Sequence, residues 1–184
     1  STLNGAAITE WNWNFGDGGT LTQTTLAPAT HAFTNSQSYP VSLSVKNANG
    51  CVSAAPFSLP VVINPNPVMD FTVSDICVGT GLANFTQNVT LNSGQVAIWN
   101  WDFGVAGSSP GSTANPSFTY TTGGEYNVTL TATSDSGCVN AIPKMVKAFS
   151  APTVAFDINN AASLCSNLPV GIIDRSAVTG YGTV

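Results

Sequence analysis

Two stretches of the sequence are near copies of each other and govern how the rest of the chain is interpreted. WNWNFGDGGT occupies residues 11–20, and WNWDFGVAGS begins 88 residues later, at Trp99. Both contain two tryptophans, a phenylalanine and a glycine, but the acidic Asp17 of the first turn is replaced by Val105 in the second. A ligand site that served every copy should keep its acid. The conserved elements therefore indicate a core strand followed by a tight turn.

Other landmarks repeat in the same order and at nearly the same spacing. YPVSLSVKNANGCV, residues 39–52, returns as YNVTLTATSDSGCV, residues 126–139. PVMDFTVSDICVG, residues 67–79, returns as PTVAFDINNAASLC, residues 152–165. Self-similarity at a fixed period is typical of tandem arrays, and the period here is roughly 87 residues.

The phase of the repeat predicts three segments. Residues 1–64 are the C-terminal part of one unit, residues 65–149 a complete unit, and residues 150–184 the start of a third. Because Ser1 and Val184 fall at nearly the same phase inside a unit, we expect the chain to be a window on a longer array. The junctions between units are short and contain proline, which restricts bending.

Local patterns within the unit predict strands throughout. Between residues 126 and 133, Tyr, Val, Leu and Ala alternate with Asn and Thr, so one face is apolar and the other polar. Glycine- and Asn/Asp-rich turns such as GDGG, NANG and SDSG separate the runs. No window shows a helical period with caps. Several short alternating strands in one such unit predict an all-β, antiparallel sandwich.

Composition excludes several classes of protein. A hydrophobic fraction of 43% is too high for a disordered chain. The net charge of −5 and only four basic residues argue against nucleic acid and against an anionic membrane surface. No apolar run approaches the roughly 20 residues that span a bilayer. With only 7% charged residues, the surface must be covered mainly by small and uncharged polar side chains.

These motifs resemble the PKD (polycystic kidney disease) domain, whose hallmark is a W-x-F-G-D-G turn, a P-x-H-x-Y/F segment and a Y-x-V-x-L-x-V-x-N strand. The first unit matches in residues 13–18, 30–33 and 39–47. The second departs at Val105, and at Ser117, which aligns with the family's histidine. The resemblance implies tandem immunoglobulin-like sandwiches of seven or so strands. The cysteines and the NxNGC ending resemble the form found in large surface proteins of Gram-negative gliding bacteria and in their secreted hydrolases.

The aromatic residues of the repeated motif are candidates for the core or for ligand contact. Residues two apart on a strand share a face, and alternating Trp and Phe are typical of a sandwich core. We expect Trp13 and Trp101 in the core, whereas Trp11 and Trp99 stay open between core and a surface that grips a sugar or a peptide. The structural motif comprises Trp11, Trp13, Phe15, Gly16, Asp17, Gly18, Trp99, Trp101, Phe103 and Gly104.

Asp17 and Asp102 raise the question of calcium, which some PKD-like modules bind. Calcium needs six to eight oxygen ligands, and the acid changes position between the copies. We therefore expect no metal and no cofactor, with Asp17 as the one weak calcium candidate and turn formation as its preferred role. His31 has no recognisable catalytic partner and is expected to be a structural, hydrogen-bonded residue. No catalytic motif is present, so we predict that this segment is not an enzyme.

The cysteines occupy two positions of the unit: Cys51 and Cys138 in one, Cys77 and Cys165 in the other. They are not spaced as zinc ligands, and they suit an oxidising, extracellular setting, with buried free thiols as the alternative. Cys77 and Cys138 are predicted at opposite ends of a unit, too far apart for a disulfide. All four cysteines are therefore candidates for disulfides between consecutive units.

The predicted function is structural and adhesive. The chain is interpreted as a segment of a long bacterial cell-surface or filament-forming protein, with other PKD-like units, surface proteins or glycans, or copies of itself as partners. Many weak contacts along an array add up to avidity. The alternative is a non-catalytic, substrate-binding accessory module of a secreted protease or glycoside hydrolase.

Overall fold

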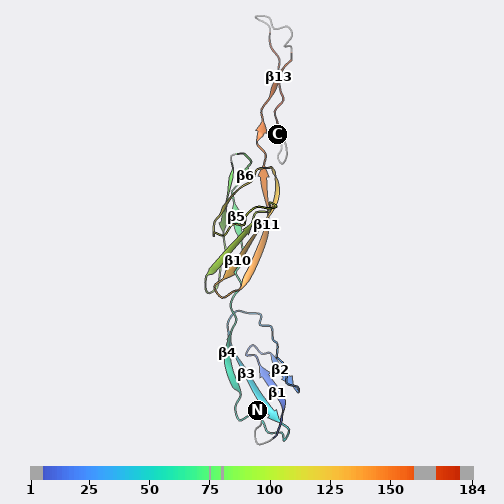
Figure 1. Ribbon diagram of the computed structural model, residues 1–184, viewed down its shortest axis with the longest axis vertical. Helices are drawn as coiled ribbons and strands as arrows, with labels where there is room; N and C mark the ends of the chain where they lie inside the picture. The colour runs from blue at the N-terminus through green and yellow to red at the C-terminus, as the bar shows by residue number, and fades with distance from the viewer. Residues whose placement is uncertain (1–5, 75, 80, 160–168, 179–184) are drawn as a thin grey trace. The chain divides into compact units, whose positions relative to one another are not determined.

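The computed structural model describes residues 6–74, 76–79, 81–159 and 169–178, and this part of the chain contains strands and no helix. None of these residues belongs to a helix with the length and hydrophobicity needed to cross a membrane. The chain divides into two compact units, Ser1–Pro65 and Asn66–Val184, here called unit 1 and unit 2 (Figure 1). The all-β prediction is confirmed. The predicted boundaries of the three repeats stay predictions.

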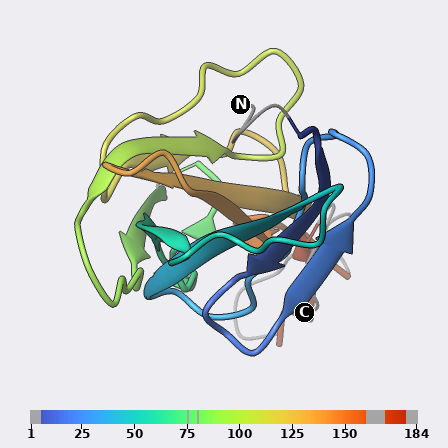
Figure 2. The ribbon, with the colours of Figure 1, turned by 90° about the horizontal axis from the view of Figure 1, so that it is seen from below.

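Unit 1 contains one four-stranded antiparallel sheet in the order β2-β1-β3-β4. Figure 2 shows these strands from below, coloured blue to teal. The first copy of the tryptophan motif forms the second strand of this sheet, where Trp13 lies opposite Leu21 on one neighbour and Leu43 on the other. The strands are β1 (Ile8–Asn14), β2 (Thr20–Gln23), β3 (Ser38–Asn47) and β4 (Phe57–Val62).

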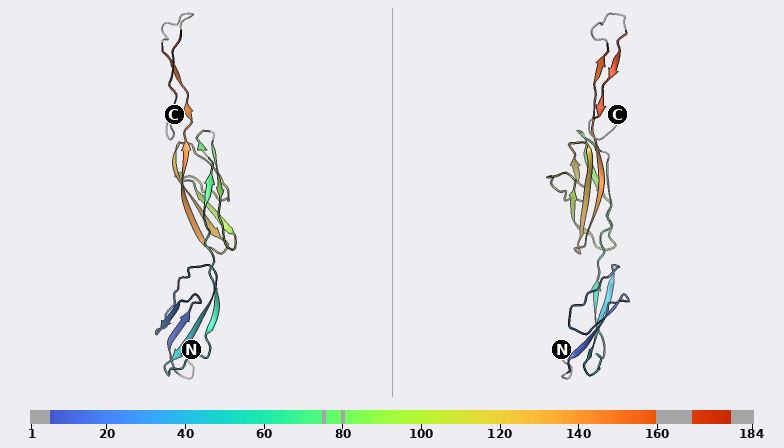
Figure 3. Two further views of the ribbon diagram at one scale, coloured as in Figure 1. Left: turned by 180° about the vertical axis from the view of Figure 1, so that it is seen from behind. Right: turned by 90° about the vertical axis from the view of Figure 1, so that its right-hand side faces the viewer.

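Unit 2 contains a sandwich of two sheets (Figures 1 and 3), one ordered β5-β7-β9 and the other β6-β11-β10-β8. We call the first the front sheet and the second the back sheet. The seven strands described between residues 66 and 149 agree with the immunoglobulin-like fold that the resemblance implies. They are β5 (Phe71–Val73), β6 (Ile76–Cys77), β7 (Leu82–Gln87), β8 (Val96–Asp102), β9 (Ser117–Thr119), β10 (Gly124–Ser134) and β11 (Val139–Phe149).

One pairing in unit 2 departs from the antiparallel prediction. β6 pairs in parallel with the end of β11, with Ile76 opposite Ala148 and Cys77 opposite Phe149. The cause is a change of sheet within a single extended segment. Residues 71–73 pair with β7 of the front sheet, and residues 76–77 pair with the edge of the back sheet. Alternation along the sequence does not reveal such a switch, because both halves of the segment are strands.

The core of unit 2 lies between its two sheets and follows the predicted alternation. Along β10, Val128, Leu130 and Ala132 are buried, whereas the threonines between them are half-buried. Front-sheet aromatic residues meet the motif of the back sheet, since the Phe71 and Trp101 ring centroids are 5.1 Å apart. The buried cluster comprises Phe71, Ile76, Ala83, Phe85, Trp101, Phe103, Tyr120, Val128, Leu130, Val146 and Ala148.

The last described residues of unit 2 form two short antiparallel pairs. β13 (Phe156–Ile158) pairs with β14 (Ile172–Asp174), and β12 (Pro152–Thr153) pairs with β15 (Ala177–Val178). We call these four strands the C-terminal hairpin. They correspond to the part of the chain in which the third repeat is predicted to begin, and many of their apolar side chains are exposed.

Candidate functional site

The turn that follows β1 is built by short-range hydrogen bonds. The Asp17 carboxylate accepts a bond of 2.9 Å from the Gly19 amide, and the Phe15 amide donates to the Gly19 carbonyl at 3.0 Å. Gly16 has a φ of +81°, and a Cβ there would lie 2.7 Å from the ring of Pro40. A side chain at this position would therefore strain the backbone and clash with β3.

The second carboxylate oxygen of Asp17 contacts a residue far along the chain. It lies 2.7 Å from His31 Nε2, and the His31 ring is stacked on Phe15 with centroids 4.1 Å apart. Hydrogen bonds from His31 and then from the Gly19 amide hold the pKa of the Asp17 carboxyl below its ordinary value. One oxygen therefore stabilises the turn itself, and the other joins the turn to the segment before β3.

The described residues hold no group of three His, Cys, Asp or Glu side chains that could bind a metal ion. At Asp17 the carboxylate contacts a ring nitrogen and an amide, both of which donate hydrogen when the acid is ionised. A calcium site requires several oxygens converging on one point. This donor set fits a structural turn and does not fit a calcium cage.

In the second copy of the motif, the apolar residues Val105 and Phe118 stand where the first copy has Asp17 and His31. Asp102 accepts from the Gly104 amide at 2.9 Å, the role that Asn14 plays toward Gly16 in unit 1. Phe118 stacks on Phe103, with centroids 4.4 Å apart, as His31 stacks on Phe15. Both Val105 and Phe118 pack against the core.

This geometry corrects the alignment made from the sequence. Ser117 does not take the place of the family's histidine, because the ring equivalent to His31 belongs to Phe118. The ring contacts also make Tyr120 the counterpart of Phe33. Tyr120 packs against Tyr126, and Phe33 packs against Tyr39, which is the equivalent of Tyr126 in unit 1. Counted from Pro116, the P-x-H-x-Y/F motif itself places Phe118 at the histidine position, and the 87-residue spacing from His31 gives the same residue.

The four tryptophans differ in burial. Trp101 is fully buried and its indole N–H donates to the Thr113 carbonyl at 3.0 Å, whereas Trp13 is half-buried and donates to Gln23 Oε1 at 3.2 Å. Trp11 and Trp99 are also half-buried. All four lie on strands, Trp11 and Trp13 on β1 and Trp99 and Trp101 on β8.

Two hollows lie beside the repeated motif, and sequence reasoning identified neither. In unit 2, an open hollow of about 580 Å³, lined by both polar and apolar residues, lies under the loop between β8 and the β-bridge at Gly111. Trp101 pairs with Gly111, ten residues later, whereas the equivalent Trp13 of unit 1 pairs with Leu21, eight residues later. This longer loop is the feature of the sequence from which the hollow could have been predicted. The hollow of unit 2 is lined by Asn100, Asp102, Gly104, Val105, Ala106, Gly107, Ser108 and Pro110.

The other hollow lies on unit 1 and is apolar. It measures about 260 Å³ and follows the face of the sheet that carries the motif aromatic residues. The lining residues are Trp13, Phe15, Ala29, His31, Phe33, Val41 and Val61. An open, largely apolar floor of this kind suits the side chains of another sheet better than a charged ligand.

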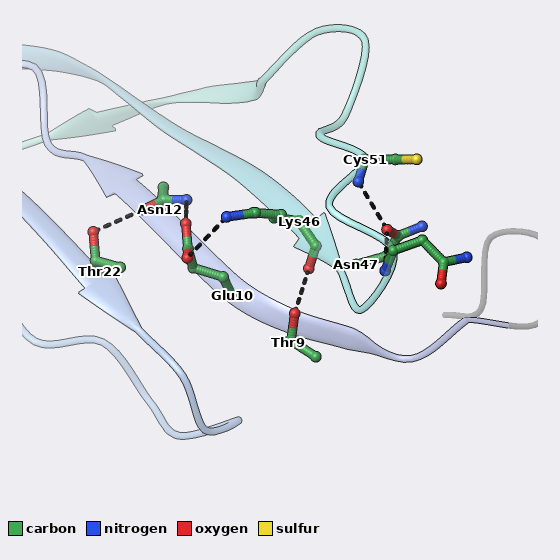
Figure 4. A network of polar contacts seen from close by, with 8 residues as sticks. Thr9, Glu10, Asn12, Thr22, Lys46, Asn47 and Cys51 are labelled. Carbon is green, nitrogen blue, oxygen red and sulfur yellow. Dashed lines mark hydrogen bonds and ion pairs between the residues drawn. The ribbon is translucent and has the colours of Figure 1, made fainter.

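The described cysteines lie at turns and strand ends. The Asn47 side chain accepts a hydrogen bond of 2.9 Å from the Cys51 amide. Figure 4 shows the Cys51 sulfur pointing away from this hydrogen bond and from the ion pair of Glu10 and Lys46. Cys51 and Cys77 are exposed free thiols, and Cys138 is half-buried. Cys165 lies outside the described residues.

The predicted separation of Cys77 and Cys138 can be followed along β11. Cys77 lies opposite Phe149 at the end of that strand, whereas Cys138 immediately precedes its first residue. Eleven residues of strand span roughly 35 Å, far beyond the roughly 7 Å that a disulfide permits between Cα atoms. No disulfide joins any two of the three cysteines in the described part of the chain, so the expectation of disulfide bonding has no support there.

Comparison with known proteins assigns the fold to a family. A family model described as a PKD domain matches residues 1–59 and 64–148. Among solved structures, the PKD1 domain of Vibrio anguillarum Epp shares 27% identity, covering 46% of this chain and 95% of that one, with a TM-score of 0.42. The PKD1 domain of the Vibrio cholerae metalloprotease PrtV shares 26% identity over 46% of this chain and 98% of that one, with a TM-score of 0.41. None of the curated proteins compared matches the chain.

Proposed function

Because this chain belongs to the PKD domain family, we propose that it is a non-catalytic, adhesive and structural segment of a long bacterial cell-surface or filament-forming protein. The observation that supports this proposal is the repetition of one set of strands and turns along the chain. The motif strand, its glycine turn and its stacked aromatic ring occur in both units. Repeated modules multiply weak contacts, so their avidity exceeds the affinity of one module.

The surface chemistry supports the same role. Most exposed positions carry uncharged side chains, since only 7% of the residues are charged. Partners such as other units, other surface proteins or glycans can approach such a surface without strong electrostatic repulsion. Contacts of this kind depend little on salt, which is a measurable property of the proposed adhesion.

Attachment of cells and of coated beads tests the proposal. Antibodies raised against this chain should label intact cells, and deletion of the segment should reduce attachment without changing secreted hydrolase activity. Beads coated with the chain should adhere to cells or to surface glycans better than beads coated with the heat-unfolded chain. If intact cells are not labelled and the beads do not differ, the adhesive proposal is wrong.

The open hollow of unit 2 favours a second candidate, an accessory module that holds the substrate of a secreted protease or glycoside hydrolase. The hollow is large enough for one or two sugar rings, and Asn100 and Asp102 place polar groups on its wall. This candidate predicts that the chain sediments with an insoluble polysaccharide or protein and that Asp102→Ala weakens the sedimentation. Retention by no insoluble material would reject it.

Disulfides between consecutive units remain a prediction within the proposed array. Cys77 lies at one end of the unit 2 sandwich and Cys138 at the other, so neighbouring units would each contribute one sulfur. Mass spectrometry of non-reduced tryptic peptides from the extracellular protein tests this pairing. A peptide that links Cys77 to Cys138 within one molecule would contradict it.

A further inference from the structure

Equivalent asparagines of the two units differ in what they contact. Asn12 on β1 and Asn100 on β8 lie 88 residues apart, at the same place in the motif. Asn12 is half-buried, and both ends of its carboxamide are bonded: the nitrogen donates to Glu10 Oε1 at 2.8 Å, and the oxygen accepts from the Thr22 hydroxyl at 2.7 Å. Asn100 is exposed, and its side chain has no hydrogen-bond partner among the described residues.

Two differences leave the Asn100 amide open. Ile98 stands where unit 1 has Glu10, and an aliphatic side chain cannot accept a hydrogen bond. In unit 1 the whole of β2 pairs with β1, whereas in the described part of unit 2 the same edge of β8 carries only the bridge between Trp101 and Gly111. The Asn100 amide therefore faces solvent on the wall of the 580 Å³ hollow.

The loop above this hollow is held in one shape. At its base, Trp101 and Gly111 exchange two backbone hydrogen bonds of 2.8 and 3.0 Å. At its tip, the Ser108 amide donates to the Val105 carbonyl at 3.1 Å, and Gly107 has a φ of +77°, as in a type II turn. A loop closed at both places needs little ordering when a ligand binds, so the hollow is largely pre-formed.

The polar groups of the hollow include an acid and exclude anionic ligands. One Asp102 oxygen accepts from the Gly104 amide at 2.9 Å, and the other has no hydrogen-bond partner in the described part of the chain. Ser108 adds a hydroxyl to the same lining. None of the described residues that line the hollow is a lysine, arginine or histidine. The negative charge of Asp102 would therefore repel a sulfated or carboxylated ligand.

The remaining lining is small and apolar, and it lies on the loop. The strand contributes Asn100 and Asp102, whereas the loop contributes Val105, Ala106 and Pro110. A sugar ring has hydroxyls at its edge and C–H groups on its faces, so it matches a hollow with one polar and one apolar wall. Its hydroxyls can both donate to a carboxylate and accept from an amide, as these two polar side chains require.

We propose that the hollow of unit 2 binds a neutral, hydroxyl-rich sugar chain. The Asn100 amide and the second Asp102 oxygen bond to ring hydroxyls, and the loop residues contact the C–H face. Thr131 lies beside Asn100 on β10, so a longer chain can continue across that strand. Unit 1 lacks this property because its equivalent amide, Asn12, is already bonded. The inference names the substrate class of the accessory module proposed above and rests on that proposal for its biological setting.

The observations favour a sugar over a protein partner. Protein partners are held mainly by large aromatic or arginine side chains that fill dry, well-packed pockets. This hollow is open, and about half of its lining residues are polar or glycine. Hydroxyl groups can replace the water on such a surface without leaving its polar groups unpaired.

Isothermal titration calorimetry of the 184-residue chain tests the proposal. The probes are neutral hexasaccharides of glucose, mannose, galactose and xylose, with oligogalacturonate as the anionic probe and chitosan oligomers as the cationic one. At least one neutral probe should bind with a Kd of about 0.1–1 mM, as a few hydrogen bonds at an open hollow allow. If no neutral probe binds, or if either charged probe binds more tightly than all of them, the proposal is wrong.

Three variants locate the binding. Asn100→Ala should raise the Kd about tenfold, and Asp102→Asn about fivefold, since a neutral group replaces a charged acceptor. Asp102→Asn keeps the turn, because Asn14 bonds to the Gly16 amide at the same place in unit 1. Asn12→Ala is the matched control, and it should leave the Kd unchanged. Equal weakening by the substitutions in unit 1 and unit 2 would overturn the assignment to this hollow.

The outcomes separate this inference from the accessory candidate. A chain that sediments with an insoluble protein and binds no neutral probe keeps the accessory role and loses the sugar site. A chain that is retained by no insoluble material but binds a neutral probe through Asn100 keeps the sugar site and loses the accessory role.

Discussion

The turns after β1 and β8 differ in chemistry although they follow nearly identical strands. In unit 1, Asp17 bonds to His31, which stacks on Phe15. In unit 2, Val105 and Phe118 pack against the core in the same places. The acid and the histidine thus change together, and packing against the core takes the place of their hydrogen bond. Joint replacement of two interacting residues is typical of a turn that serves folding.

The largest expected difference between the copies concerns the second tryptophan of each motif. Trp101→Ala should destabilise unit 2 by about 3–5 kcal/mol, since it removes a fully buried ring. Trp13→Ala should destabilise unit 1 by roughly half as much, because Trp13 is half-buried in the single chain. Hydrogen exchange read by mass spectrometry reports each unit separately. Equal losses in the two units would contradict the difference in burial.

Exchanging the two turn chemistries should show coupling between the replaced residues. In unit 2, Val105→Asp or Phe118→His alone should each destabilise by about 1–3 kcal/mol, because each leaves a polar group without its partner. The double variant should recover part of this loss, with a coupling free energy of about 0.5–3 kcal/mol. Urea unfolding of the two single variants and the double variant measures it, and strictly additive losses would show that the pair does not act as a unit.

The pH dependence of unit 1 should depend on Asp17. Since folding lowers the pKa of this carboxyl below 3.8, the stability it contributes is fully present above that pH and is lost as the pH falls through the lowered pKa. Asp17→Asn should therefore destabilise unit 1 at neutral pH and converge with the wild type in strong acid. Urea midpoints across this range measure the effect. Val105→Asn is the control, and its effect on unit 2 should not change with pH.

The smallest expected effect is that of calcium. Because the Asp17 carboxylate is occupied by hydrogen-bond donors in unit 1 and is replaced by Val105 in unit 2, millimolar calcium or EDTA should leave both melting transitions unchanged within about 1 °C. Differential scanning calorimetry of the intact chain makes this measurement. A rise on adding calcium that EDTA reverses would restore Asp17 as a metal ligand.

Much of the fold could be predicted because its cues are local. The alternation along residues 126–133 and the glycine turns predict strands without knowledge of their neighbours, and the repeat shows which strands are equivalent. The parallel pairing of β6 could not be found in this way. It depends on which sheet edge lies beside residues 76–77, and that is decided by packing between distant segments.

The candidate site was predicted less completely, for a related reason. The turn role of Asp17 follows from an Asp-Gly pair, but its contact with His31 joins residues 14 positions apart. The 87-residue spacing makes Phe118 equivalent to His31, but the stacking of Phe118 on Phe103 joins residues 15 positions apart and is seen only in the structure. The two hollows depend on the length of the loop after β8 and on which side chains meet on one face of the unit 1 sheet, and residue types alone reveal neither.

The parallel pairing of β6 with β11 has a mechanical consequence. β6 belongs to the first segment of the sandwich and β11 is its last strand, and they are joined where the Val78 amide donates to the Phe149 carbonyl at 2.8 Å. When the two ends of the domain are pulled apart, these strands slide in opposite directions along their length. The hydrogen bonds between the two strands are then loaded at the same time, in a shear geometry. Bonds loaded together resist more force than bonds that open one after another.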